Sequence, residues 1–245
     1  MLFLLSGEGP SDMGSCSSGE RFCGLGKDDF RPGPMALFVD KLADIILNYS
    51  PLETYIMAYV SEKGLGDLKE KGRKIFLSGS KAGKGNAYFR KNAFLLGRYA
   101  LEMKEDQGQS VVAILFRDCD GTRSSPRSEW DDKRKSIVSG FKLAGLRTGV
   151  AMVPKTKSEC WLLCAVQEGQ SYRDCARFEE LSGNDSSEKG APKKVLREAL
   201  GEEGTSELLN DLIRNGTIDP IRIDMPSFNA FKEDFEEAIR IAMKE

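Results

Sequence analysis

The feature that most constrains the fold is a series of short apolar runs that alternate with longer segments of helical periodicity. Ser110–Phe116 is a continuous apolar run, typical of a central strand covered on both faces. Met1–Leu5, Thr54–Val60 and Thr148–Val153 are similar runs, and helical patterns separate them, the clearest over Met35–Asn48. This alternation predicts an α/β fold with a mainly parallel central sheet flanked by helices.

The rest of the chain divides into helices and irregular segments. The polar, glycine-rich stretch 10–34 is expected to be a long loop. From about residue 181 onward only helices are predicted. We therefore expect an α/β domain over 1–180, with a helical C-terminal extension over 181–245 packed on it. Further helices are expected at Ala87–Lys104, Trp130–Ala144, Ser158–Val166, Pro192–Leu200, Thr205–Arg214 and Phe228–Met243, with Thr205 as an N-cap, and a short strand at Lys74–Leu77.

Composition excludes several classes of chemistry. The 245-residue chain contains no histidine, which rules out Ser-His-Asp and Cys-His catalysis and His-ligated zinc. Its formal net charge of −2 gives no global attraction to nucleic acid, so any such surface would be a local patch. No apolar run approaches the roughly 20 residues of a membrane span, and Met1–Leu5 is too short for a secretory signal. A soluble, cytoplasmic protein is expected.

The cysteines also agree with a cytoplasmic location. None of the six forms a C-x-x-C pair, which argues against a zinc ribbon. In a reducing cytoplasm we expect them to be free thiols. They are Cys16, Cys23, Cys119, Cys160, Cys164 and Cys175.

Acidic residues follow two of the apolar runs, where a glycine-containing turn begins. Glu8 and Asp12 follow the first run, and Asp118 and Asp120 follow the central one, while Glu159 lies in a third segment. In an α/β sheet these positions are the carboxyl edge of the strands, where ligands bind. Gathered carboxylates repel one another unless a cation lies among them, and such hard oxygen ligands suit Mg²⁺ or Mn²⁺.

The spacing suggests how such a site would be arranged. Residues i and i+2 of a strand point to the same side, so Asp118 and Asp120 can reach one metal if strand geometry persists that far. Glu8 would complete the metal cage or act as a general base. Two alternatives remain open: Asp12 as a turn residue or N-cap, and Glu159 as an acid favoured in the first turn of a helix.

These motifs resemble the TOPRIM domain of topoisomerases, primases, ribosomal-RNA maturases and OLD-family nucleases. The matching segments are Glu8-Gly9-Pro10-Ser11-Asp12 and Asp118-Cys119-Asp120. Lys157-Ser158-Glu159-Cys160-Trp161-Leu162 is similar to a helix of uncharacterised bacterial TOPRIM-like proteins, whose genes often neighbour those of ABC-type ATPases in phage-defence loci. The resemblance covers about residues 1–166. It departs from the smallest TOPRIM domains in the long segment after Glu8.

The resemblance implies a Mg²⁺- or Mn²⁺-dependent nuclease, a phosphodiesterase acting on DNA or RNA, with an ATPase as partner in antiviral defence. Glu8, Asp118 and Asp120 would be catalytic and metal-binding, Glu159 would serve a second metal, and Lys157 would neutralise charge on a phosphate. The alternative is a non-catalytic TOPRIM-like subunit that binds a partner, and a third hypothesis is metal-dependent nucleotidyl transfer. Either could form a homo-oligomer.

Basic residues supply candidate nucleic-acid contacts. The glycine- and lysine-rich segment Ser78–Gly85 has the wrong spacing for a Walker A loop, because Ser78 stands where glycine is required and Gly85 replaces the Ser/Thr that holds Mg²⁺. Cations near aromatic residues can bind a nucleic-acid backbone, although a solvated basic loop explains them equally well. The candidates are Lys81, Lys84, Arg90, Arg117 and Arg123.

Overall fold

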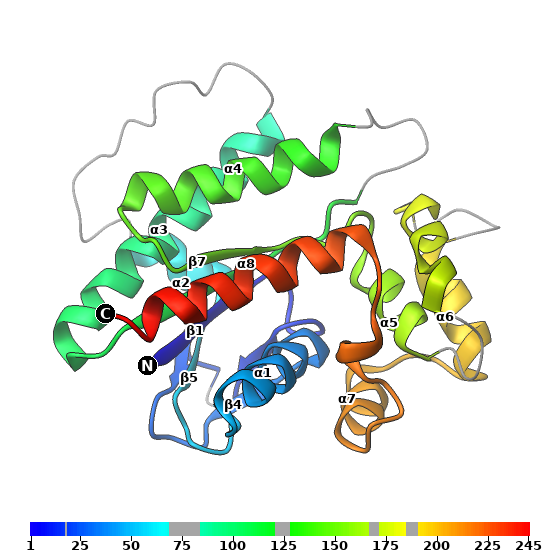
Figure 1. The fold of residues 1–245 in the computed structure, drawn as a ribbon, viewed down its shortest axis with the longest axis horizontal. Coiled ribbons are helices and arrows are strands. Elements are labelled where there is room, and N and C mark those ends of the chain that lie inside the picture. Colours follow the sequence, from blue (N-terminus) through cyan, green and yellow to red (C-terminus); the bar gives the residue numbers. More distant parts are fainter. Residues whose placement is uncertain (18, 69–83, 121–127, 167–171, 185–190) are drawn as a thin grey trace.

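The computed structural model of the chain describes all residues except 18, 69–83, 121–127, 167–171 and 185–190. Within the described residues, a five-stranded sheet has its strands in the order β3 (Phe22–Gly24), β5 (Met57–Val60), β1 (Leu2–Gly7), β6 (Val111–Phe116) and β7 (Gly149–Met152) (Figure 1). β5, β1, β6 and β7 are parallel, and β3 pairs antiparallel with β5 at one edge. The predicted α/β fold with a mainly parallel sheet is confirmed.

Helices cover both faces of this sheet (Figure 1). α3 (Lys84–Gln107) and α4 (Glu129–Ala144) pack against each other on one face, and α2 (Glu62–Leu68) contacts α3. α1 (Pro34–Leu47) and α8 (Pro226–Ala242) contribute to the core on the other face. The remaining helical elements are α5 (Ser158–Val166), η1 (Tyr172–Glu180), α6 (Pro192–Leu200), α7 (Ser206–Arg214) and η2 (Pro220–Arg222).

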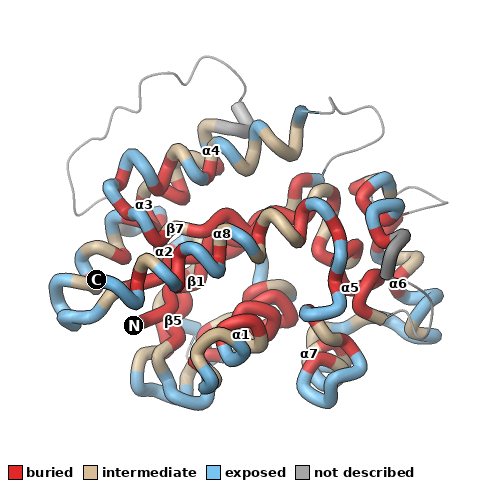
Figure 2. Tube along the Cα trace, viewed as in Figure 1, coloured by how far each residue is buried: buried red, intermediate tan, exposed pale blue. Residues whose placement is uncertain are grey.

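Alternate strand residues enter two separate cores. Phe3 and Leu5 of β1 pack toward α1 and α8, whereas Leu2 and Leu4 pack toward α3 and α4. All four are at most 4% exposed, and the other residues of the sheet are buried except Phe22 and Gly149, which are half-buried, whereas the outer helix faces are exposed (Figure 2). Burial on both faces explains why these strands read as continuous apolar runs rather than alternating ones.

The C-terminal helix α8 is part of the layer that covers the sheet. Phe228 lies edge-on to Trp161 with ring centroids 5.0 Å apart, and Phe235 reaches Phe3 of β1 at 6.1 Å. Trp161 Nε1 donates a hydrogen bond to Ser227 Oγ at 2.9 Å. The helical extension therefore packs on the α/β core as expected, and the division at residue 180 stays a prediction.

Local signals set several helix ends. Thr205 caps α7, since its Oγ1 accepts a hydrogen bond from Leu208 N at 3.2 Å, as predicted. α6 begins with Pro192 and ends at Leu200; the next residue, Gly201, has the left-handed φ of 77° that favours glycine after a helix. α5 and α6 have the predicted bounds, whereas α3 begins earlier than expected, at Lys84.

The predicted loop over 10–34 is wrong in part. It contains β2 (Gly14–Cys16) and β4 (Phe30–Pro32), which pair antiparallel, as well as the edge strand β3. These three-residue strands depend on partners distant in sequence. Gly14 has φ 108° and lies so close to β4 that a Cβ would be 2.1 Å from the Arg31 carbonyl oxygen. Helix α2 was also not predicted, and the strand expected at 74–77 lies outside the described residues.

Four of the six cysteines form disulfides. Cys16 bonds to Cys23, and Cys164 bonds to Cys175. The expectation of free thiols is therefore wrong for these four and correct for Cys119 and Cys160, which are free and buried. Disulfides persist mainly in oxidising compartments, so the cytoplasmic location stays a prediction only. Among the described helices, none combines the length and apolar character that crossing a membrane requires.

Candidate functional site

The carboxyl ends of β1 and β6 lie side by side. Between these two strands the order of the sheet switches, because later strands are added on one side of β1 and then on the other. From β1 the chain passes through α1 to β5 on one side, and it later reaches β6 on the other side through α3. Gly7 pairs with Phe116, so Glu8 and Arg117 leave the sheet from neighbouring strands. Such a switch point is where open α/β sheets bind ligands. The two acidic segments therefore follow adjacent strands of the sheet.

Ser158 joins two of the acids. Its Oγ donates to Asp12 Oδ1 at 2.6 Å, and its backbone N–H donates to Asp118 Oδ1 at 2.9 Å. Ser158 begins α5, which also contains Glu159. Residues from three distant segments are thereby held together at one edge of the sheet.

The carboxylates of this group repel one another. Burial first, and then the negative charges of Asp12, Glu159 and Asp120, raise the pKa of Asp118 well above its usual value. Burial likewise raises the pKa values of Asp12 and Glu159, with Glu8 adding to the effect on Asp12. Glu159 Oε2 is buried and has no hydrogen-bond partner among the described residues. The group is therefore short of positive charge and of hydrogen-bond donors.

Glu8 itself faces a buried arginine. Arg117 Nη1 lies 2.5 Å from Glu8 Oε2, and Nη2 lies 2.5 Å from Glu62 Oε1 and 3.1 Å from Tyr88 Oη. The Arg117 side chain is only 6% exposed, whereas that of Glu8 is 42% exposed. Arg117 thus lies inside the site, where it neutralises two carboxylates, rather than on an exposed nucleic-acid-binding surface.

Asp120 and Asp118 are not related by strand geometry. β6 ends at Phe116, and Asp120 has a left-handed φ of 52° with its side chain 55% exposed. The premise that strand alternation would bring both side chains to one side is therefore wrong, although Asp120 still acts electrostatically on Asp118. Lys157 Nζ lies 3.7 Å from Asp120 Oδ1, so the predicted cation stands beside the predicted acids.

The other candidate nucleic-acid contacts are mostly not described. Lys81 and Arg123 lie outside the described residues. Lys84 is the first residue of α3, and Arg90 is half-buried in the same helix. No basic patch of these residues can be assembled from the described part of the chain.

Both disulfides hold segments that contain site residues. Cys16 belongs to β2, which follows directly after the turn with Glu8 and Asp12, and its bond to Cys23 ties that segment to β3. Cys164 belongs to α5, the helix of Glu159, and its bond to Cys175 ties α5 to η1. The cross-links therefore restrain two of the three acidic segments.

Sequence reasoning underrated or missed four residues. Asp12 was considered as a turn residue, yet its negative charge helps to raise the pKa values of Asp118 and Glu159. Glu62 follows the apolar strand β5, so the rule that selected Glu8 and Asp118 could have found it. The contacts of Ser158 with the two acids and of Tyr88 with Arg117 could not be predicted, because they join segments that are distant in sequence.

The donor set fits a divalent cation in its chemistry. Asp12, Asp118 and Glu159 are hard oxygen donors whose mutual repulsion a cation would relieve, and the unpartnered Glu159 Oε2 could accept such a bond. As they stand, however, no three acidic or cysteine side chains in the described part of the chain converge as metal ligands. Metal binding would therefore require these side chains to rotate.

Comparisons of the chain with protein-family models, curated proteins and solved structures found no match.

Proposed function

We propose that this chain is a divalent-cation-dependent phosphodiesterase that cleaves DNA or RNA at the carboxyl ends of β1 and β6. The observation that supports it most is the group of partly buried, mutually repelling carboxylates of Asp12, Asp118 and Glu159 at the switch point of the sheet. Keeping such a group is costly unless a positive ligand offsets it. The TOPRIM-like order of the acidic motifs points to the same chemistry.

The metal-binding residues would be Asp118 and Glu159 with Asp12, while Glu8 and Asp120 stand at the margin of the group. Bound there, Mg²⁺ or Mn²⁺ would supply positive charge to a phosphoryl oxygen and make a bound water more acidic. Because the pKa of Asp118 is raised, its proton would compete with the metal, so metal affinity should increase as pH rises.

The chain's own side chains would position and neutralise the substrate. Arg117 orients the Glu8 carboxylate, which is exposed enough to accept a proton from an attacking water. Lys157 provides a positive charge beside Asp120, where it would stabilise charge on a phosphate. Ser158 keeps Asp12 and Asp118 in place through its two hydrogen bonds.

A second candidate is a non-catalytic subunit that binds a partner, such as the ATPase implied by the resemblance. Two observations favour it: Glu8 is already engaged by Arg117, and no three described carboxylates converge as ligands. Under this alternative, the acidic group would be structural or regulatory.

Asp118→Asn separates the two candidates, since asparagine keeps the Oδ1 acceptor for Ser158 N–H but removes the charge. Cleavage of single- and double-stranded DNA and RNA would be measured with Mg²⁺ or Mn²⁺. We expect activity in the wild type, loss in Asp118→Asn, and no change in Asp211→Asn, a surface acid on α7 that is 67% exposed. A wild type that cleaves none of these substrates, alone or with its ATPase partner, would favour the second candidate.

A further inference from the structure

A recess opens at the same edge of the sheet, beside the acidic group. It has a volume of about 510 Å³, within the range of small-molecule sites. The segments that follow β1 and β5 line it together with β2, whereas the acids follow β1 and β6. Glu62 lines the recess and shares the Arg117 guanidinium with Glu8. Arg117 thus links the recess to the candidate catalytic carboxylates.

We propose that this recess binds the nucleoside of the nucleotide adjoining the scissile phosphate, an inference that rests on the proposed function. A substrate lying across the edge would have its phosphate near Asp118 and its sugar and base near β5 and β2. Ser15 and Ser61 provide hydroxyl groups, and Glu62 provides a carboxylate that can accept hydrogen bonds from sugar hydroxyls or base amino groups.

The rim of the recess suits a nucleotide. Gly9 and Gly19 line it in left-handed conformations, with φ of 72° and 70°, so no side chain covers the backbone there. Lys63 is exposed at the rim and can meet a neighbouring phosphate. Arg21, also at the rim, forms an ion pair with Asp67.

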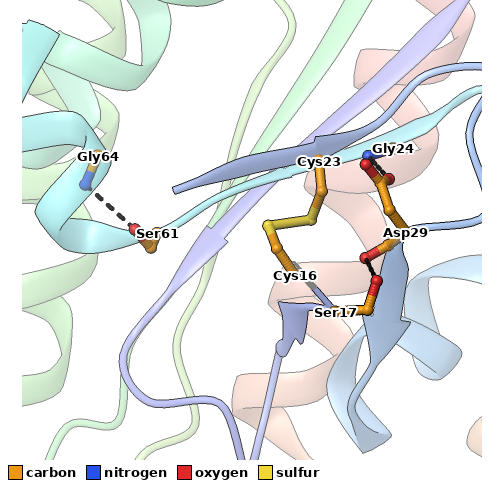
Figure 3. Close-up of a disulfide and its surroundings, with 7 residues drawn as sticks. All are labelled: Cys16, Ser17, Cys23, Gly24, Asp29, Ser61 and Gly64. Atoms are coloured by element: carbon orange, nitrogen blue, oxygen red, sulfur yellow. Dashed lines mark hydrogen bonds between the residues drawn. A yellow bond between two sulfur atoms is a disulfide. The ribbon is translucent and has the colours of Figure 1, made fainter. Parts of the chain in front are cut away.

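The wall formed by β2 is fixed in place before any ligand binds. Cys16 lines the recess, and its disulfide to Cys23 fastens β2 to β3 (Figure 3). The next residue, Ser17, donates from its N–H and Oγ to the Asp29 carbonyl oxygen at 2.8 and 3.1 Å. A preformed wall lowers the entropic cost of binding.

The opposite wall is fixed in a similar way. Ser61 Oγ accepts a hydrogen bond from Gly64 N–H at 3.1 Å, and Ser61 N–H donates to the Arg21 carbonyl oxygen at 2.8 Å (Figure 3 shows the first of these). Both sides of the recess therefore have a defined shape without a ligand.

The test is titration of the full chain with the 3′,5′-bisphosphates of adenosine, guanosine, cytidine and uridine by calorimetry, in EDTA so that metal plays no part. Ser15→Trp should fill the recess, and Lys63→Glu should repel the phosphate. Each is expected to weaken binding about tenfold, or about 1.4 kcal/mol. Lys27→Glu is the matched control, because Lys27 is exposed but lines a different groove. Circular dichroism would verify that Ser15→Trp folds. Lys63→Glu provides a second test that does not alter a strand, because Lys63 is an exposed residue of α2.

Binding that weakens in both recess variants and not in the control supports the proposal. No mononucleotide binding to the wild type at millimolar concentration would overturn it, as would equal affinities for Lys63→Glu and Lys27→Glu. The cleavage assay with Asp118→Asn reports on the proposed function separately, since that variant should retain mononucleotide affinity while losing activity.

Discussion

Removing the two disulfides should cost this chain a large part of its stability. The perturbation is a pair of double variants, Cys16→Ser with Cys23→Ser and Cys164→Ser with Cys175→Ser. The cross-linked residues are 7 and 11 positions apart. In the chain-entropy account, loops of that size stabilise the folded state by about 2.4 and about 2.8 kcal/mol, because they restrict the unfolded chain.

Together the two losses reach about 5 kcal/mol, whereas domains are typically stable by only about 5–15 kcal/mol. Urea unfolding followed by tryptophan fluorescence would measure each loss, since Trp161 is fully buried and reports on the core between α5 and α8. Oxidised and dithiol-reduced wild type would be compared in the same way. The reduced wild type should unfold at a urea concentration close to that of a variant that combines all four Cys→Ser substitutions.

Cys119→Ser provides the control, because Cys119 is buried and forms no disulfide. It should respond to the reductant as the wild type does. The reasoning would be refuted if the unfolded, unreduced protein contained six titratable thiols. A change of less than about 1 kcal/mol on reduction would refute it as well.

Three further predictions concern individual side chains. The pKa of Asp118 is raised in the folded state, so the folded state keeps the carboxyl proton of Asp118 to higher pH than the unfolded state does. In the presence of a chelator, the free energy of unfolding of the wild type should therefore fall as pH rises above about 3.9, the ordinary pKa of an aspartate. Asp118→Asn should flatten that fall, and an unchanged pH profile would contradict the assignment. Arg117→Met should lower the free energy of unfolding by about 2–4 kcal/mol, because Glu8 and Glu62 lose their partner; an exposed control, Arg98→Met, should change it little. Thr205→Ala should cost about 1 kcal/mol in thermal or urea unfolding, whereas Thr205→Ser should retain the cap; equal losses would argue against capping.

The parts of the fold that sequence could predict are those with local signals. The α6 bounds agree because the helix begins with Pro192 and is followed by Gly201. The bounds of the short apolar helix α5 also agree, although no proline or glycine marks its ends. The strands over 14–32 could not be predicted in this way. Each has only three residues and forms through pairing with distant segments, and the Cys16–Cys23 link that holds them has no sequence signature of its own.

For the candidate site, too, some features could be predicted from the sequence and others could not. The positions of Glu8 and Asp118 were predictable, because strand ends can be read from sequence and parallel strands end at a common edge. What each carboxylate contacts was not predictable. The pairing of Glu8 with Arg117 depends on the register of β1 with β6, and the hydrogen bonds of Ser158 depend on the packing of α5 against the turn after β1.

The most direct test of the central claim is a crystal of the protein soaked in Mn²⁺ and analysed by anomalous diffraction. The account predicts a single strong peak at the edge formed by β1, β6 and α5, with oxygen atoms of Asp118 and Glu159 about 2.1 Å away. The peak should disappear in Asp118→Asn. A wild-type crystal with no anomalous peak at this edge at millimolar Mn²⁺ would contradict the account.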